Sequence, residues 1–436
     1  MSFVVGLVLQ TSSRLWSSLV FTLGTAPSSS TELKIVCKMP PPAFSQAPSP
    51  SHLLRTHTAH VNTLWFSDDN ERLYSGDAAG LVVITSTRTF RPLAAWNAHT
   101  DGLLGVQELW DCIITHGRDN KLHVWERLQE PTTSLGGSAA VPGLTVPSLR
   151  YSMDVNALNY CRFSLHVKCH TEPHERSALL ALPNLVEFSL ADIWVLPSRQ
   201  RLHAAIGKPD LSTSSATAGR NASGIIMSMH LFEACHPSTS DRKELRILLA
   251  YEDGSVNLRR FAGTEKETSI EGVGWESLWS LKFHAESVMA MAVAPDNSFA
   301  LSVSADHLVG RYDLIASDGT GDPADASTTL HRTKYPGNGA IAIRDDGRVC
   351  AIGGWDGKIR LYSTKSFKAL GTLNHHKSAC QALAFARSKP REVPVADEDS
   401  EDEMSEEEKN ERSRWLASGG RDTRVAVWVL MNFSRS

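Results

Sequence analysis

Short runs of alternating apolar and polar residues recur along the chain and are separated by turn residues. Residues 98–125 show a His, a strand-like run, a second apolar run, an Asp in a tight turn, and a third run that closes on an aromatic residue. Residues 283–313 repeat this order, and residues 375–388 with 414–428 repeat it around an insertion. Such runs predict β-strands joined by tight turns. Two α/β domains are not expected, because no long pattern with a helical period lies between the strands.

A fixed spacing connects the turn Asp with the residues around it. In three complete copies an aromatic residue follows the Asp by six positions, and a Ser or Thr precedes it by four. Asp356 and Tyr362 keep this spacing in a fourth, partial copy. We expect the Asp to bind the His, the His to bind the hydroxyl, and the hydroxyl to meet the aromatic residue, because buried polar groups are tolerated only when paired. The predicted structural tetrads are His99, Thr115, Asp119 and Trp125; His284, Ser302, Asp306 and Tyr312; and His376, Ser418, Asp422 and Trp428.

This recurring unit resembles the WD repeat, and seven copies can be aligned. Their turn positions are 79, 119, 184, 253, 306, 356 and 422. The first copy departs from the pattern, because Ala79 stands where the Asp is expected, Thr85 stands in the aromatic position, and Asp77 comes two residues early. The fourth copy has Arg259 in the aromatic position, and the third, around Asn184, keeps only hydrophobic alternation.

Five of the six steps between turns exceed the ~40–45 residues of a typical WD repeat, which indicates loop insertions. The insertions are residues 132–143, 207–224, 316–328 and the acidic 388–413. They are rich in Gly, Ser, Thr, Pro or charge, and we expect no ordered structure in them. We expect residues 52–57 to supply the outermost strand of the last blade and so close the ring. The fold prediction is therefore an all-β, seven-bladed WD-repeat β-propeller with loop insertions over residues 50–432.

Residues 1–49 precede the predicted propeller as an N-terminal extension. The first 31 residues are apolar and rich in Ser and Thr, but the apolar run 3–9 is far shorter than the ~20 residues that cross a membrane. Met39 opens a Pro-rich tract that is typical of a natural start. We therefore interpret this extension as disordered or as a mis-assigned start, and we expect no membrane association.

The composition excludes a wholly disordered chain, since 42% of residues are hydrophobic and 21% are charged. The net charge of −4 conceals an asymmetry. Residues 397–411 hold ten acidic residues and one Lys, a charge of −9, so the rest of the chain carries +5. Its basic residues are scattered, without the basic stripe and interleaved aromatic residues of nucleic-acid binders, and direct nucleic-acid binding is not expected.

The acidic segment also carries two candidate phosphorylation sites. Ser400 and Ser405 each have an acidic residue three positions downstream, a context that acidophilic kinases favour. Phosphorylation would add roughly −1.5 to −2 charge at each site and make the segment a ligand for a basic pocket. The alternative is a solvated loop that serves solubility alone.

Motifs of catalysis and of cofactor binding are absent from the sequence. It has no phosphate-binding G-x-x-x-x-G-K-[ST], no G-x-S-x-G and no H-E-x-x-H. The tetrad His and Asp residues are accounted for structurally, so the protein is predicted to be no enzyme and to have no cofactor. Seven cysteines without a C-x-x-C pair fit a reducing compartment. The group Cys161, His166, Cys169, His170 and His174 matches no common zinc spacing, and no metal is expected.

Protein binding is the function that the pattern favours. Arg118, Trp355 and Arg421 each precede a turn Asp and should face outward there. Arg and Trp are enriched in binding hot spots, so we predict that these three residues contact a partner. The alternative is that Arg118 and Arg421 form salt bridges with neighbouring blades.

Three stretches also resemble one WD-repeat family, the fungal ASTRA-associated protein 1 family. They are residues 50–99, 102–126 and 418–430, with the likeness strongest in S-G-D-x-x-G at 75–80, R-P-x-x-x-W-x-A-H at 91–99 and T-H-G-R-D-N at 115–120. The P-x-x-x-L-R-x-H-like run from Pro50 to His57 and the L-P-N of the third copy, 182–184, add to it. Residues 1–39 and the insertions lie outside the resemblance.

The resemblance implies a non-catalytic scaffold subunit of the ASTRA complex. Its partners would be phosphatidylinositol-3-kinase-related kinases, their assembly cochaperones and AAA+ helicases. It further implies a link to chromatin regulation and to kinase-complex assembly, a nuclear location with a cytoplasmic pool, and a monomeric propeller within a hetero-complex. The alternatives are a G-protein β-like WD-repeat adaptor and a ubiquitin-ligase substrate receptor. The first lacks support at residues 1–50, which show no coiled-coil heptads.

Overall fold

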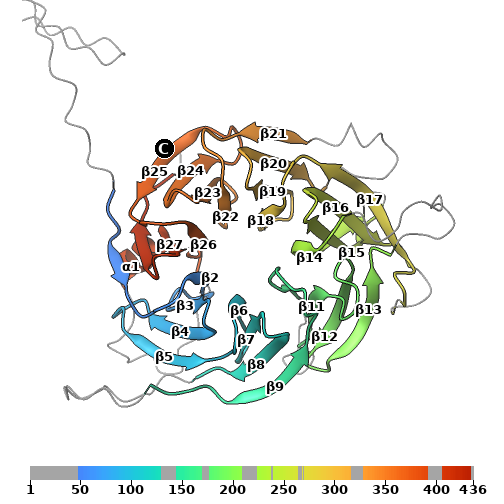
Figure 1. The fold of residues 1–436 in the computed structure, drawn as a ribbon, viewed down its shortest axis with the longest axis horizontal. Helices are drawn as coiled ribbons and strands as arrows, with labels where there is room; N and C mark the ends of the chain where they lie inside the picture. Colours follow the sequence, from blue (N-terminus) through green and yellow to red (C-terminus); the bar gives the residue numbers. More distant parts are fainter. Residues whose placement is uncertain are drawn as a thin grey trace, which may run out of the picture. The chain divides into compact units, whose positions relative to one another are not determined.

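The fold is a closed ring of small β-sheets around a central axis (Figure 1). A computed structural model describes residues 48–128, 144–168, 176–208, 223–236, 239–263, 268, 270–315, 328–390 and 405–433. In this part of the chain, twenty-eight strands form seven four-stranded antiparallel sheets, and one short helix accompanies them. The prediction of a seven-bladed β-propeller is therefore confirmed.

Each blade runs from an inner first strand to an outer fourth strand. Blade 1 contains β2 (Val61–Phe66), β3 (Arg72–Asp77), β4 (Leu81–Ser86) and β5 (Pro92–Asn97). Blade 2 contains β6 (Leu103–Leu109), β7 (Cys112–Gly117), β8 (Lys121–Glu126) and β9 (Leu149–Asp154). Blade 3 contains β10 (Ser164–Val167), β11 (Ala178–Pro183), β12 (Ala191–Leu196) and β13 (Gln200–Ile206). Blade 4 contains β14 (Ile226–His236), β15 (Thr239–Tyr251), β16 (Ser255–Phe261) and β17 (Trp275–Lys282). Blade 5 contains β18 (Val288–Val293), β19 (Phe299–Ser304), β20 (Leu308–Asp313) and β21 (Thr329–Arg332). Blade 6 contains β22 (Asn338–Ile343), β23 (Val349–Gly354), β24 (Lys358–Ser363) and β25 (Ala369–Asn374).

Blade 7 joins the two ends of the propeller. It contains β26 (Cys380–Phe385), β27 (Trp415–Gly420), β28 (Val425–Val429) and, as its outer strand, β1 (His52–Leu54). Leu53 of β1 lies opposite Ala426 of β28, and the Ser51 hydroxyl donates to the Val427 carbonyl over 2.9 Å. The expected closure is thus confirmed, although the closing strand ends at Leu54 because His57 belongs to the polar network of blade 1.

The hydrophobic core consists of seven layers, one between each pair of neighbouring blades in the described ring. The second strands of blades 1, 2, 3, 5, 6 and 7 are buried along their whole length. Both sides of these strands face another blade, so they read as continuous apolar or small runs rather than as alternation.

Two faces of the ring follow from this strand order. We call the face that carries the turns between second and third strands the tetrad face, and the other face the hairpin face. Three of the predicted insertions, 132–143, 316–328 and 388–413, connect strands at the hairpin face, whereas 207–224 joins blades 3 and 4 at the tetrad face. Most of their residues lie outside the described ranges, as do residues 1–47 and Ser400.

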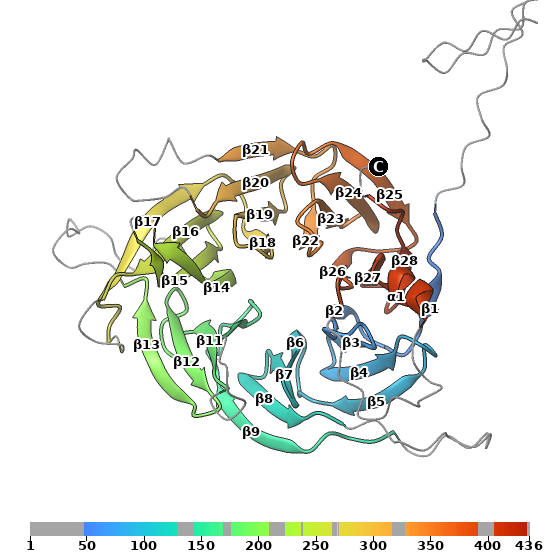
Figure 2. The same cartoon turned by 180° about the vertical axis from the view of Figure 1, so that it is seen from behind.

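The end of the acidic segment is ordered, contrary to expectation. Residues Glu406–Arg412 form helix α1, which lies beside β1 at the rim of blade 7 (Figure 2). A capping box begins the helix, because Ser405 accepts from the Glu408 N–H and Glu408 accepts from the Ser405 N–H. Arg412 is buried at the other end, where it donates to Thr87 over 3.1 Å and stacks on Trp415. The helix therefore ties blade 7 to blade 1.

No helix among the described residues has the length and apolar character that a membrane crossing requires.

Candidate functional site

The tetrad face is built on a polar network inside blade 2. The imidazole of His99 lies 2.8 Å from Asp119 Oδ1 through Nδ1 and 2.8 Å from Thr115 Oγ1 through Nε2. Trp125 Nε1 donates to the same hydroxyl over 2.9 Å. His99 precedes the first strand of the blade, Thr115 lies on the second, and Trp125 lies on the third. One chain of hydrogen bonds therefore connects these three strands.

Blades 5 and 7 carry the same arrangement. His284 and His376 bind Asp306 and Asp422 over 3.0 Å, and they bind Ser302 and Ser418 over 2.7 and 2.8 Å. Trp428 Nε1 donates to Ser418 over 2.9 Å, whereas in blade 5 the Tyr312 hydroxyl lies 3.0 Å from Ser302. The structure thus brings together all four members of each of the three predicted tetrads.

The electrostatics of blade 2 assign the protons in this network. Burial lowers the pKa of His99, so its imidazole is neutral at pH 7. Burial alone would raise the pKa of Asp119, but hydrogen bonds from the Thr100 N–H and from His99 outweigh it and hold that pKa below its usual value. The carboxylate can only accept, so His99 Nδ1–H donates to Asp119 and Nε2 accepts the Thr115 O–H. Every group of the tetrad is thus paired in its preferred protonation state, which stabilises the fold.

Blade 1 keeps the His and the hydroxyl of the pattern, His57 and Ser75, but takes its acid from a position that the pattern did not predict. Asp77, two residues early, still binds His57 Nδ1 over 2.9 Å, and His57 Nε2 lies 2.7 Å from Ser75. The other carboxylate oxygen of Asp77 accepts hydrogen bonds from the backbone N–H groups of Ala79 and Leu81. In blade 1 an Asp at the end of the second strand therefore replaces the Asp that other blades have in the turn. Thr85 does not complete the chain, because its buried hydroxyl has no partner among the described residues.

Blades 3 and 6 substitute other polar pairs. In blade 6, Arg360 of β24 binds Asp356 through both guanidinium nitrogens, over 2.6 and 3.1 Å, and so takes the place of a His. In blade 3 the buried Asp192 accepts from Asn184 Nδ2 over 2.9 Å. Asp356 and Asn184 stand at predicted turn positions, but their partners Arg360 and Asp192 were missed, because a substitute from another strand does not keep the repeat spacing.

Arg118, Trp355 and Arg421 occupy equivalent places on the surface of the tetrad face. The backbone N–H of each donates to a carbonyl in the link that precedes the first strand of a blade, over 2.9, 2.8 and 2.9 Å. All three side chains are exposed, and 49% of Trp355 is open to solvent. Among the described residues neither Arg pairs with a carboxylate, and Arg118 lies over the Tyr160 ring at 4.7 Å. In the described ranges, therefore, neither Arg118 nor Arg421 forms the salt bridge with a neighbouring blade that was the alternative.

Glycines make room for the exposed indole. A Cβ added at Gly337 or Gly339 would lie 2.9 and 3.0 Å from atoms of the Trp355 ring. The ring thus rests on bare backbone and is held in place while its outer face stays open. A rigid, half-exposed Trp on the same face as two Arg side chains without carboxylate partners in the described ranges is suited to binding a protein surface.

One group of donors in the described ranges could be considered for a metal. His99, Asp119 and His123 offer ligand atoms within 4.8 Å of one another. Both ring nitrogens of His99 are engaged in the tetrad, however, so a metal would have to displace Asp119 from it. This donor set does not fit a metal site. Of the Cys and His group in blade 3, only Cys161 and His166 are described, and His166 lies 3.6 Å from Glu233.

Comparisons with known proteins agree with this architecture. The family described as WD domain, G-beta repeat matches residues 48–84 and 275–313. ASTRA-associated protein 1 of Verticillium alfalfae is 30% identical, with 88% of this chain and 93% of that protein covered. The proteins of the same name from Penicillium rubens and Schizosaccharomyces pombe are 30% and 25% identical, over 88% of this chain in both cases and over 98% and 99% of their own lengths. The similarity therefore spans the whole propeller.

Proposed function

The chain belongs to the ASTRA-associated protein 1 family, and on that premise we propose that it is a non-catalytic scaffold subunit of an ASTRA complex. Its partners are other protein subunits: phosphatidylinositol-3-kinase-related kinases, their assembly cochaperones and AAA+ helicases. The role of the complex is the assembly of the kinases and the regulation of chromatin. The propeller enters the complex as a single copy and works in the nucleus, with a cytoplasmic pool.

The observation that supports this function best is the surface formed by Arg118, Trp355 and Arg421. The buried tetrads hold the turns rigid, and the exposed residues on the same turns are the types that dominate binding energy in protein interfaces. A rigid surface loses little conformational entropy on binding, which suits a scaffold that must hold several proteins in a fixed arrangement.

Affinity purification of the tagged full chain from its own cells, followed by mass spectrometry, tests the identity of the partners. We expect the kinases, their cochaperones and the AAA+ helicases to be recovered. Recovery of cullin adaptors in their place would contradict the proposal and favour a ubiquitin-ligase substrate receptor. Fluorescence imaging of the same tagged chain tests location, and a signal excluded from the nucleus would contradict a nuclear role.

Phosphorylation of Ser400 and Ser405 is proposed as a regulatory input to this scaffold. Ser405 is exposed and is followed by Glu406, Glu407 and Glu408, which supports recognition by an acidophilic kinase. Phosphate at both positions would strengthen the acidic segment as a ligand for a basic pocket. Phosphopeptide mapping of protein purified from cells checks this, and two unmodified serines would contradict it.

A further inference from the structure

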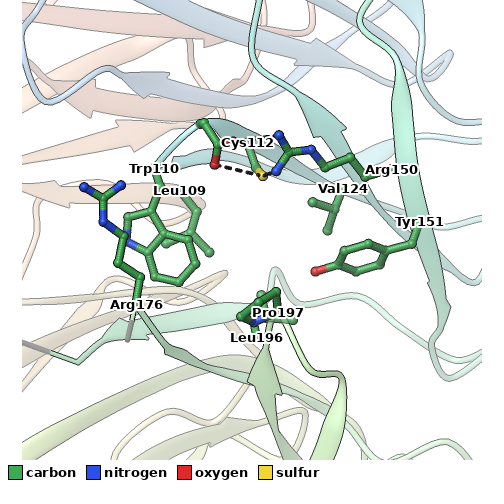
Figure 3. A pocket seen from close by; sticks show the side chains of 10 residues that line it. Leu109, Trp110, Cys112, Val124, Arg150, Tyr151, Arg176, Leu196 and Pro197 are labelled. Carbon is green, nitrogen blue, oxygen red and sulfur yellow. Dashed lines mark hydrogen bonds and ion pairs between the residues drawn. The ribbon is translucent and has the colours of Figure 1, made fainter. Parts of the chain in front are cut away.

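A pocket lies on the hairpin face between blades 2 and 3 and is separate from the tetrad face. Its volume is about 360 Å³, within the range of sites that hold a ligand side chain. Leu109 and Trp110 of the β6–β7 turn form one wall, and Leu196 and Pro197 of the β12–β13 turn form another (Figure 3). Tyr151 of β9 lies across the opening from Trp110 in the same view. Apolar and aromatic side chains thus form facing walls of the pocket.

Trp110 occupies a position that does not favour it. Leu109 pairs with Cys112, so only two residues form the turn, and Trp110 has φ of +55°. This left-handed conformation suits Gly or Asn, and Asn70, Asn297 and Gly347 supply it in the corresponding hairpins of blades 1, 5 and 6. Phe90 and Phe367 also have positive φ, but each of their rings stacks on a neighbouring ring, whereas Trp110 lines the pocket.

Arg176 lines the pocket, and Arg199, which is not part of the lining, contacts the lining residue Tyr151. Arg176 lies beside Trp110 in Figure 3, and Arg199 stacks over the Tyr151 ring at 5.1 Å. Neither has a carboxylate partner within the described ranges, whereas Arg150 binds Asp111 over 2.6 Å. Burial raises the pKa of the neighbouring Cys112 thiol to about 11, so this thiol is uncharged at pH 7 and adds no negative charge. Two guanidinium groups without a carboxylate partner in the described ranges thus lie at or beside a pocket with apolar and aromatic walls.

We propose that this pocket binds a linear segment of a partner protein in which one large apolar side chain is flanked by Asp or Glu. The apolar side chain enters between Trp110 and Tyr151, and the flanking carboxylates pair with Arg176 and Arg199. An uncharged or basic segment would leave both guanidinium groups unpaired beside it, which makes acidity the discriminating property. The proposal uses no residue of the tetrad face, so it stands or falls separately from the scaffold function.

A random peptide library displayed on phage provides the test. The library is selected on the full chain and counter-selected on the Trp110→Gly variant, which removes the ring but keeps a residue suited to the positive φ. We expect the enriched peptides to share one aromatic or aliphatic residue between acidic residues. A labelled synthetic copy of the most enriched peptide should bind the variant R176E/R199E about tenfold more weakly or worse, and its affinity for the wild-type chain should fall as NaCl is raised.

The matched control is Arg348→Glu, a charge reversal of an exposed Arg on the hairpin face of blade 6, which should leave peptide affinity unchanged. Peptides that lack acidic residues, or no enrichment over the counter-selection, would overturn the proposal. So would equal affinity for the wild-type chain and R176E/R199E. If Trp110→Gly lowers the melting temperature, R176E/R199E decides the question, because both of its side chains are exposed and its fold should be intact.

Discussion

Neighbouring residues on the same turns of the propeller have opposite environments. Asp119 and Asp422 point inward and bind a buried His, whereas Arg118 and Arg421, one position earlier, are exposed and pair with no carboxylate in the described ranges. The inner position contributes to the fold and the outer position is open for binding. A single turn therefore separates stability from recognition, and the two can be altered independently.

A comparison of the polar networks beneath these turns shows which of their features is essential. Blades 2, 5 and 7 use the complete tetrad, blade 1 moves the acid to Asp77, and blade 6 replaces the His by Arg360. Residue identity changes, but a buried His or Arg is paired with a carboxylate each time, although Asp356 itself is exposed. The requirement is thus satisfaction of buried polar groups rather than one fixed set of residues.

Lowering the pH should produce the largest loss in the free energy of unfolding, because it acts on buried histidines and leaves the exposed Arg residues charged. Burial lowers the pKa of His116 to about 3 and that of His203 to about 4. Their neutral forms stabilise the fold above the unfolded pKa of ~6.5, and this stability is lost as pH falls, since only the unfolded chain then binds protons. From pH 7 to 5 we expect a loss of about 2 kcal/mol per His, or about 4 kcal/mol for both, in urea unfolding.

The His203→Phe variant is the control for this pH dependence. Its ring can keep the contacts with Phe261 and Trp275, whose centroids lie 4.5 and 5.3 Å from that of His203, but it does not titrate. The variant should lose about half of the acid effect. An unchanged pH dependence would show that His203 is not held neutral by the fold.

Asp119→Ala should produce the next largest loss. It leaves His99 Nδ1–H and the Thr100 N–H without their acceptor, one of them buried, and should lower the free energy of unfolding by about 3 kcal/mol. Arg118→Ala, one residue away, should stay within about 0.5 kcal/mol of the wild-type chain. Thermal and urea unfolding measure both, and equal effects would remove the distinction between the inner and outer positions.

Smaller effects of opposite sign are expected at two buried Thr residues of the polar networks, Thr115 of the second strand in blade 2 and Thr85 of the third strand in blade 1. Thr115 binds His99 and Trp125, whereas Thr85 is buried without a hydrogen-bond partner among the described residues. Thr115→Val should therefore lower the free energy of unfolding by about 2 kcal/mol, and Thr85→Val should raise it by up to about 1 kcal/mol. Destabilisation by Thr85→Val in urea unfolding would indicate a partner for that hydroxyl.

The sequence allowed the tetrads to be predicted because they obey local spacing. Thr115, Asp119 and Trp125 come from one pair of adjacent strands, and strand geometry fixes the distances between them along the chain. The replacements could not be found in this way, since Asp77 and Arg360 reach the same place from a different strand position. Helix α1 did carry a signal, the S-x-x-E capping box at 405–408, which the acidic composition concealed.

The pocket on the hairpin face had no such signal. Trp110 and Pro197 are far apart in the sequence and belong to different blades, and only the packing of blade 2 against blade 3 brings them together. The strain at Trp110 is likewise a property of the two-residue turn, which depends on the register of β6 against β7. Sites between blades therefore require the structure.

The most direct test of the scaffold function is the variant that combines Trp355→Ala with Arg421→Glu, compared with the wild-type chain by affinity purification and by melting temperature. Both residues are exposed, so the melting temperature should not change, while recovery of the partner proteins should be abolished. Full recovery of the partners at an unchanged melting temperature would contradict the assignment of the tetrad face as the binding surface.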